Sequence, residues 1–141
     1  MSFIIVFCYL VVTSHAQDLS TSEACKKYES QNWVDYELKV TQIKGQILDG
    51  FSARVSQGCL SLFTEDTHKL IVTITADDDG FFKFDKIPMG RYRLVVRDPE
   101  KAFCPANAII KIVKWRLGRN SLVVRLVPRS TDVCSEIKYK K

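Results

Sequence analysis

The sequence is poor in the residues on which catalytic and metal sites are most often built. Its 141 residues include two histidines, and one of them, His15, falls within the first sixteen residues. The other, His68, cannot alone supply the paired ligands of a zinc site or a nucleophile together with its base. Glycine, at six residues, and proline, at four, are also scarce, which excludes a collagen-like or low-complexity chain. We therefore expect a protein that is not an enzyme and that has no catalytic residues, metal ligands or cofactor.

The first sixteen residues have the pattern of an export signal. Phe3 to Val12 is a run of ten residues without a charge, and Ser14-His15-Ala16 places small residues at the two positions that a signal peptidase reads. The alternative is a buried N-terminal strand. A membrane anchor is not expected, because a bilayer requires ~20 apolar residues. Cleavage after Ala16 predicts an exported chain, periplasmic or secreted, with no membrane span.

Removal of the signal would leave an even number of cysteines, since Cys8 would leave with it. The remaining four are Cys25, Cys59, Cys104 and Cys134. Four cysteines in an exported chain indicate two disulfides, for which three pairings exist. Zinc is the alternative, but the chain has no C-x-x-C pair and the spacings of 34, 45 and 30 residues match no compact ligand motif.

The chain after residue 36 has the pattern of short strands separated by tight turns. Apolar residues alternate along several segments, so that Tyr92, Leu94 and Val96 share one strand face. Asp79-Gly80 is a hairpin-turn signal, because glycine accepts a positive φ. The expected strands are Leu38–Leu48, Cys59–Thr64, Leu70–Thr75, Phe81–Asp85, Tyr92–Arg97, Ala108–Trp115 and Ser121–Val127. This spacing predicts an all-β, seven-stranded antiparallel β-sandwich.

Two segments of different character flank the strands. Residues 17–36 are expected to be an N-terminal extension with a short helix over 24–29, preceded by a weak capping box. Residues 129–141 are expected to be a polar tail held by Cys134. The predicted organisation is a signal peptide over 1–16, the extension over 17–36, one sandwich domain over 37–128, and the tail.

Four stretches of the strand region resemble the carboxypeptidase regulatory-like domain. They are Gly45-Gln46-Ile47-Leu48-Asp49-Gly50, Gly58-Cys59-Leu60-Ser61-Leu62, Thr75-Ala76-Asp77-Asp78-Asp79-Gly80-Phe81-Phe82-Lys83-Phe84 and Ile87-Pro88-Met89-Gly90-Arg91-Tyr92-Arg93-Leu94-Val95-Val96. The resemblance covers residues 40–127. It implies a prealbumin-like Greek-key sandwich, related in shape to Cna protein B-type domains, and says little about function.

The implied fold favours one disulfide pairing. Ala108–Trp115 and Ser121–Val127 flank a short turn, so we expect them to form an antiparallel hairpin. Cys104 precedes this hairpin and Cys134 follows it, which places both at its open end. We therefore predict a Cys104–Cys134 bond, which leaves Cys25 and Cys59 to join the extension to the sandwich.

Two enzyme families with related sandwiches require residues that this chain lacks. Hydroxyisourate hydrolases rely on paired histidines and a Tyr-Arg-Gly-Ser terminus, whereas this chain ends Ile137-Lys138-Tyr139-Lys140-Lys141. Intradiol dioxygenases hold iron with two histidines and two tyrosines. Asp77-Asp78-Asp79-Gly80 invites a calcium interpretation, but it lacks the spaced oxygens and the distant glutamate of an EF-hand. A solvated hairpin turn is the expectation for this segment.

Positive charge is concentrated in the second half of the chain. Residues 17–88 contain 8 Lys+Arg and 12 Asp+Glu, while residues 89–141 contain 13 and 4, giving net charges of −4 and +9. Such a surface suits an anionic glycan or a protein partner, and nucleic acid is not expected for an exported chain. A solvated basic face is the alternative. The candidate partner surface consists of Arg91, Arg93, Arg97, Lys111, Lys114, Trp115, Arg116, Arg119 and Arg125.

The sequence thus predicts a non-catalytic, exported module that binds a carbohydrate or protein through a sheet surface or loops. The alternative is a structural or assembly subunit of the cell envelope that uses a sheet edge. A binding module predicts a clustered basic or aromatic patch, whereas an assembly subunit predicts an uncovered edge strand. The sequence leaves the oligomeric state open.

Overall fold

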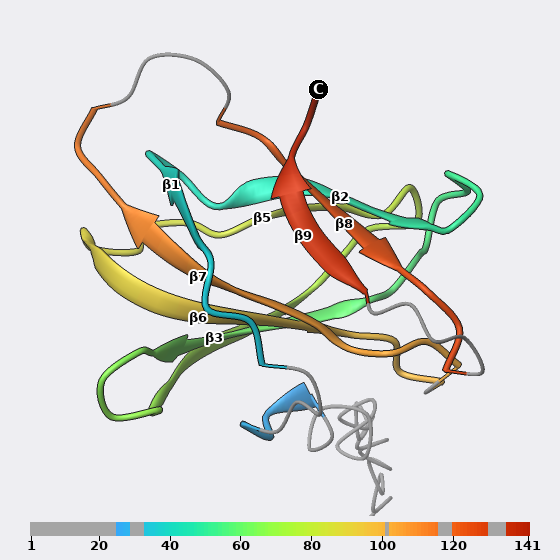
Figure 1. Ribbon diagram of the computed structural model, residues 1–141, viewed down its shortest axis with the longest axis horizontal. Coiled ribbons are helices and arrows are strands. Elements are labelled where there is room, and N and C mark those ends of the chain that lie inside the picture. The colour runs from blue at the N-terminus through green and yellow to red at the C-terminus, as the bar shows by residue number, and fades with distance from the viewer. Residues whose placement is uncertain (1–24, 29–32, 101, 116–119, 130–134) are drawn as a thin grey trace, which may run out of the picture.

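The computed structural model describes residues 25–28, 33–100, 102–115, 120–129 and 135–141. Nine strands lie within these residues and form two sheets packed face to face (Figure 1). The strands are β1 (Glu37–Val40), β2 (Lys44–Asp49), β3 (Cys59–Thr64), β4 (Leu70–Thr75), β5 (Phe81–Lys83), β6 (Gly90–Arg97), β7 (Ala106–Ile112), β8 (Leu122–Leu126) and β9 (Glu136–Tyr139). Their order is β1-β7-β6-β3-β4 in one sheet and β5-β2-β8-β9 in the other, which confirms the all-β sandwich.

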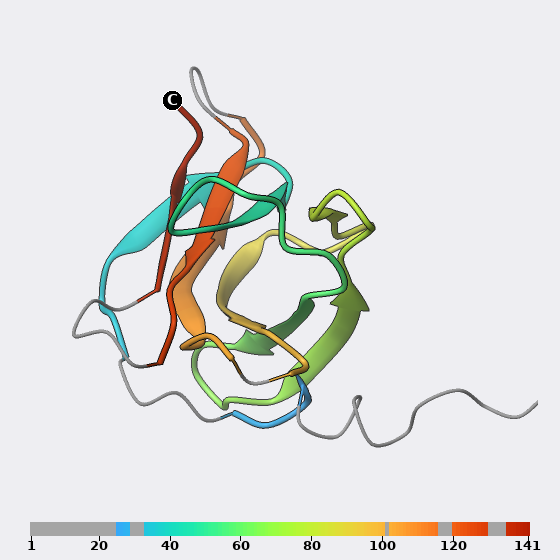
Figure 2. The ribbon, with the colours of Figure 1, turned by 90° about the vertical axis from the view of Figure 1, so that its right-hand side faces the viewer.

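The core is built by strand alternation, because every second side chain of a strand points between the sheets. Tyr92, Leu94 and Val96 of β6 are buried there, as the sequence predicts. On the facing sheet, the inward side chains of β8 are also buried. They are Leu122, Val124 and Leu126. In Figure 2, the two sheets curve around this shared interior.

The predicted strand Leu38–Leu48 is in fact two strands in different sheets. β1 pairs in parallel with β7, whereas β2 pairs in parallel with β8, so the sandwich is not wholly antiparallel. The chain changes layer at residues 41–43. The Asn120 side chain holds this crossing, since its Oδ1 accepts a hydrogen bond from Thr41 N at 2.7 Å. Residue pattern alone does not show a layer change, because apolar residues continue through it.

The expected hairpin between the last two predicted strands is wrong. β7 lies between β1 and β6, and β8 lies between β2 and β9 in the opposite sheet. The connection between them therefore crosses from one layer to the other. A short polar turn between two apolar segments fits either arrangement, and packing between the layers decides which one forms.

The C-terminal segment is a strand rather than a polar tail. β9 pairs antiparallel with β8, and the two run side by side in Figure 1. Ile137, 1% exposed, enters the core between charged neighbours. The signal segment 1–16 lies outside the described residues. Of the predicted helix over 24–29, residues 25–28 are described, and 26–28 are not helical. Within the described part of the chain, no helix is long and apolar enough to cross a bilayer.

Candidate functional site

An N-terminal strap, residues 25–28 and 33–36, lies across the outer face of the five-stranded sheet. In Figure 2, its blue residues 25–28 lie on the outside of the curved sheet. The predicted Cys25–Cys59 disulfide is present and ties the strap to the start of β3. The Ser61 hydroxyl donates to the Cys25 carbonyl, and Arg97 Nη2 donates to the Lys27 carbonyl at 2.7 Å. The extension is therefore a cover for part of this face.

A stack of aromatic rings holds the strap down. Tyr28 lies between His68, with ring centroids 4.1 Å apart, and Trp33, at 4.7 Å. Its edge contacts Phe63, an outward-facing residue of β3, at 4.9 Å. Burial raises the pKa of the Tyr28 hydroxyl, while the Arg93 charge opposes that rise. His68, the histidine that cannot alone form a zinc or catalytic site, contributes its ring to this packing.

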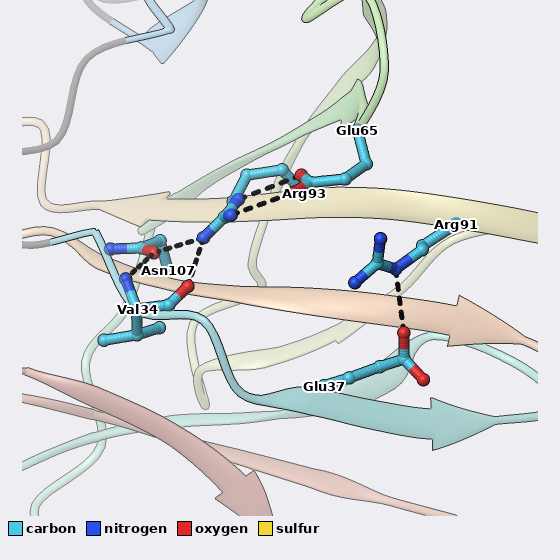
Figure 3. A network of polar contacts seen from close by, with 6 residues as sticks. All are labelled: Val34, Glu37, Glu65, Arg91, Arg93 and Asn107. Carbon is cyan, nitrogen blue, oxygen red and sulfur yellow. Dashed lines mark hydrogen bonds and ion pairs between the residues drawn. The ribbon is translucent and has the colours of Figure 1, made fainter.

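Arg93 is the charged centre beneath the strap (Figure 3). Its Nε and Nη2 donate to the two oxygens of Glu65 at 3.1 and 3.0 Å, and its Nη1 donates to the Val34 carbonyl at 2.6 Å and to Asn107 Oδ1 at 3.0 Å. The guanidinium also lies 5.0 Å from the centroid of the Trp33 ring. With 5% of its surface exposed, Arg93 is not part of a partner surface, and that prediction is wrong.

Beyond the strap, the same outer face is open and carries a row of cations. We define the cation row as Lys39, Lys111 and Arg91, which lie directly opposite one another across β1, β7 and β6. The Arg91 side chain is 54% exposed, and its Nε donates to Glu37 Oε2 at 2.8 Å (Figure 3). No carboxylate of the described residues pairs with Lys111. Like charges placed directly opposite one another repel, so this arrangement favours an anion.

The rest of the predicted partner surface is divided by the fold. Lys114 and Trp115, the latter 73% exposed, follow β7 at the same end as the cation row. Arg97 is half-buried, and its Nη2 donates to the Lys27 carbonyl of the strap at 2.7 Å. Arg125 lies in the opposite sheet, where its Nη1 donates to the Asp49 carbonyl at 3.0 Å. Arg116 and Arg119 lie outside the described residues.

Two tyrosines that the sequence analysis missed join the two sheets along one side. The Tyr36 hydroxyl donates to the Ile137 carbonyl at 2.8 Å and accepts from Ile137 N at 3.1 Å. The Tyr139 hydroxyl makes the same pair of bonds with the backbone of Lys39, at 3.1 and 2.7 Å. Burial raises the pKa of Tyr36. These bonds link edge strands β1 and β9, and because their partners are backbone groups, no pair of side chains reveals them in the sequence.

The second predicted disulfide stays a prediction. Cys104 is a half-buried free thiol in the structure, and Cys134 lies outside the described residues. The Ser135 hydroxyl donates to the Cys104 carbonyl at 2.7 Å and accepts from Val127 N at 2.9 Å. The residue that follows Cys134 in the chain is therefore in contact with Cys104.

The run of acidic residues at 77–79 forms a tight turn, as expected, but the predicted hairpin is wrong, because the turn joins β4 of one sheet to β5 of the other. Asp77 Oδ1 accepts from the backbone amides of Asp79 and Phe81 at 2.9 and 2.8 Å, and Gly80 has a φ of 78°. Asp79 pairs with Arg54 at 2.8 Å. Across the residues that the structure describes, no group of three or more His, Cys, Asp or Glu side chains is placed to hold a metal ion.

Comparison with known proteins yields similarity of architecture. No family model matches the chain, and no curated protein matches it. Among solved structures, the chain is similar to 5-hydroxyisourate hydrolase from Klebsiella pneumoniae, with a TM-score of 0.49 and 16% identity over 71% of this chain and 99% of that chain. It is also similar to 3-chlorocatechol 1,2-dioxygenase from Rhodococcus opacus 1CP, with a TM-score of 0.38 and 7% identity over 81% of this chain and 70% of that chain. Both similarities concern the sandwich fold alone.

Proposed function

We propose that the protein is an exported, non-catalytic module that binds an anionic glycan through the cation row. The observation that carries this proposal is the direct cross-strand placement of Lys39, Lys111 and Arg91 on the half of the face that the strap leaves open. The proposal also relates this chain to the carboxypeptidase regulatory-like domain family. The tight turn at Gly80 and the entry into β6 at Gly90, where that family's motifs have their turns, support it.

The geometry of the row favours a partner with repeated negative charges. Neighbouring strands lie about 4.8 Å apart, so three cations in register span about 10 Å. Glu37 offsets the charge of Arg91 by an ion pair, and Lys111 lies between two cations. An anionic chain laid across the three strands would relieve this repulsion, and the relief would weaken as salt screens it.

The exposed aromatic residue beside the row supports a glycan in particular. Trp115 follows β7 closely and is 73% exposed, although large aromatic rings are usually at least partly buried. An exposed indole offers an apolar face for a sugar ring, and the cations offer ion pairs to sulfate or carboxylate groups. The surface is an open sheet face rather than an enclosed pocket, which suits a polymer better than a small substrate.

A charge-reversal experiment tests the proposal. We expect Lys111→Glu to lower the affinity for heparin about tenfold or more, the equivalent of about 1.4 kcal/mol, because it removes one ion pair and repels the anion. The matched control is Lys83→Glu, which makes the same change of net charge on β5 of the opposite sheet. Affinity would be measured by calorimetry at several salt concentrations. Equal losses in the two variants, or none in either, would contradict binding at the cation row.

A further inference from the structure

We propose that the turn after β2, residues 49–53, docks into a pocket at the opposite end of a second copy of this chain, so that copies join head to tail. We call this turn the tip. It carries Phe51, which is 94% exposed. The pocket has a volume of about 320 Å³ and a floor of buried apolar residues. Neither the tip nor the pocket includes a residue of the cation row, so the proposal does not depend on glycan binding.

The tip holds Phe51 on an ordered backbone. Asp49 Oδ1 accepts hydrogen bonds from the backbone N of Phe51 at 2.8 Å and of Ala53 at 2.9 Å. Arg125 Nη1 donates to the Asp49 carbonyl at 3.0 Å and to Ser52 Oγ at 3.2 Å. A side chain presented in this way loses little conformational freedom on binding. The exposed phenyl ring is therefore suited to anchor a contact in a partner's pocket.

The pocket lies between the two sheets, at the end of the sandwich away from the tip. Its floor consists of Ile43, which precedes β2, Phe84, which follows β5, and Ile112, which ends β7. The tip follows the other end of β2, and Figure 1 shows the β2–β3 connection at the right and the arrowhead of β7 at the left. An apolar cavity of about 150 Å³ holds a benzene molecule, so the pocket is large enough for a phenyl ring.

Acidic side chains surround the tip. Asp98 and Glu100 line a hollow beside it, together with Arg54. The acidic run at 77–79 adjoins the same hollow, because Asp79 pairs with Arg54 at 2.8 Å. Carboxylates outnumber the arginines in this region. A surface of this sign attracts a basic surface and is repelled by the anionic headgroups of a membrane.

The rim of the pocket has the opposite charge. Lys86 lines the pocket, and Lys44 directly follows the floor residue Ile43. Neither lysine lies in an ion pair with the described residues, whereas the neighbouring Asp85 pairs with Lys83 at 3.8 Å. Docking of the tip would bring carboxylates to these two lysines. A second copy is the occupant that we infer, because it supplies both the ring for the floor and the negative charge for the rim.

The contact joins two different surfaces, so it is heterologous and leaves a free tip at one end of a pair and a free pocket at the other. Further copies can therefore add at both ends. A contact anchored by one side chain belongs among the small, weak interfaces. We expect association only at high protein concentration, and less of it as salt screens the charges.

Sedimentation velocity over a range of protein concentrations, at low salt and without glycan, tests the proposal. We expect oligomers larger than a dimer, and we expect Phe51→Ser to weaken association about tenfold or more, because it removes the anchoring ring. The backbone bonds of the tip do not involve that ring. Phe81→Ser is the matched control, since it removes another exposed phenyl ring outside the tip and the pocket. A protein that is monomeric at every concentration would overturn the proposal, as would equal effects of the two substitutions.

A mixing experiment distinguishes head-to-tail docking from a symmetric contact. The double variant Gln42→Glu/Lys86→Glu makes the rim of the pocket acidic, and neither original side chain bonds to another described residue. We expect this variant and Phe51→Ser each to be largely monomeric alone. Mixed in equal amounts, they should form pairs and nothing larger, because one supplies an intact tip and the other an intact pocket. A mixture without pairs would contradict the proposal.

A membrane is the other partner that an exposed phenyl ring suits. Flotation with phosphatidylcholine vesicles tests this alternative, and we expect the protein not to float with them. Flotation that Phe51→Ser abolishes, from a protein that is monomeric in solution, would make the tip a membrane contact and the proposal wrong. Heparin binding by Phe51→Ser should equal that of the unsubstituted protein, so failure of this proposal and failure at the cation row are separate results.

Discussion

Two arginines of β6 show how differently the two halves of one sheet face are used. Arg91 and Arg93 are two residues apart and point to the same side. Arg93 lies beneath the strap, where a bidentate carboxylate, a carbonyl, an amide and an indole ring surround it. Arg91 lies beyond the strap, half exposed, with one hydrogen bond to Glu37. Strand alternation determines the face of a side chain, but a distant segment determines whether that face meets water.

Removal of the Cys25–Cys59 disulfide, which ties the strap to β3, should cause the largest loss of stability. The double variant Cys25→Ser/Cys59→Ser opens a loop of 34 residues, and we expect its free energy of unfolding to fall by about 3–4 kcal/mol, because the unfolded chain gains entropy. Urea denaturation would measure the loss. The single variant Cys59→Ser is the control and should behave like the double variant. A loss below about 1 kcal/mol would show that the noncovalent contacts suffice to hold the strap.

The next effect comes from substituting the two arginines themselves. Arg93→Ala leaves the Glu65 carboxylate and the Val34 carbonyl without their donor, and we expect a loss of about 2–3 kcal/mol of stability. Arg91→Ala is the matched control on the same strand face, and we expect a change below about 0.5 kcal/mol, because its ion pair is solvated. Both would be measured by urea denaturation. Equal losses would contradict the distinction between covered and open halves.

The smallest expected effect concerns alkaline pH and the tyrosine at the end of the strap. Burial raises the pKa of Tyr36 above its usual value of 10.0, so the folded protein disfavours the phenolate. The neutral Tyr36 hydroxyl therefore contributes stability that is fully present below pH ~10. This contribution is lost as the pH rises through the pKa that Tyr36 has in the folded protein. Tyr36→Phe should reduce stability at pH 7 by about 1 kcal/mol, through its lost hydrogen bonds. The stability of this variant should also fall less steeply above pH 10.

Unfolding free energies measured from pH 7 to 11 would provide this comparison. The phenolic pKa values of Tyr28 and Tyr92 are also raised by burial, so Tyr36→Phe should lessen the alkaline loss without removing it. Tyr139→Phe is a useful control, because that hydroxyl makes the equivalent contact on the neighbouring strand. If the free energy of unfolding fell equally steeply above pH 10 in the unsubstituted protein and in Tyr36→Phe, a contribution from Tyr36 would be contradicted.

The sequence predicted those features that depend on local pattern. Alternation identified the inward residues of β6, and Asp79-Gly80 identified a tight turn, though not the change of sheet that this turn makes. The Cys25–Cys59 bond was also predicted correctly. The layer change at residues 41–43 and strand β9 were not predicted, because both depend on pairing with distant strands. The cover over Arg93 was missed for the same reason, since its parts come from residues 33, 34, 65 and 107.

The candidate surface was predicted in part. The basic character of the second half of the chain pointed to Arg91, Lys111, Lys114 and Trp115, which the structure places at one end of the five-stranded sheet. Lys39, from the more acidic half, completes the cation row, and net charge by segment gave no reason to select it. Its place opposite Lys111 follows from the parallel pairing of β1 with β7, a contact between residues about 70 positions apart.

The Cys25–Cys59 bond also determines how the protein would transmit a mechanical load. Tension applied to the chain ahead of Cys25 would pass through the disulfide into β3, and the intervening residues 26–58 would carry none of it. β3 is an interior strand, bonded to β6 on one side and to β4 on the other. A pull from the N-terminal side would therefore be resisted by the β3–β6 and β3–β4 hydrogen bonds at once, while β1 and β2 would carry no load.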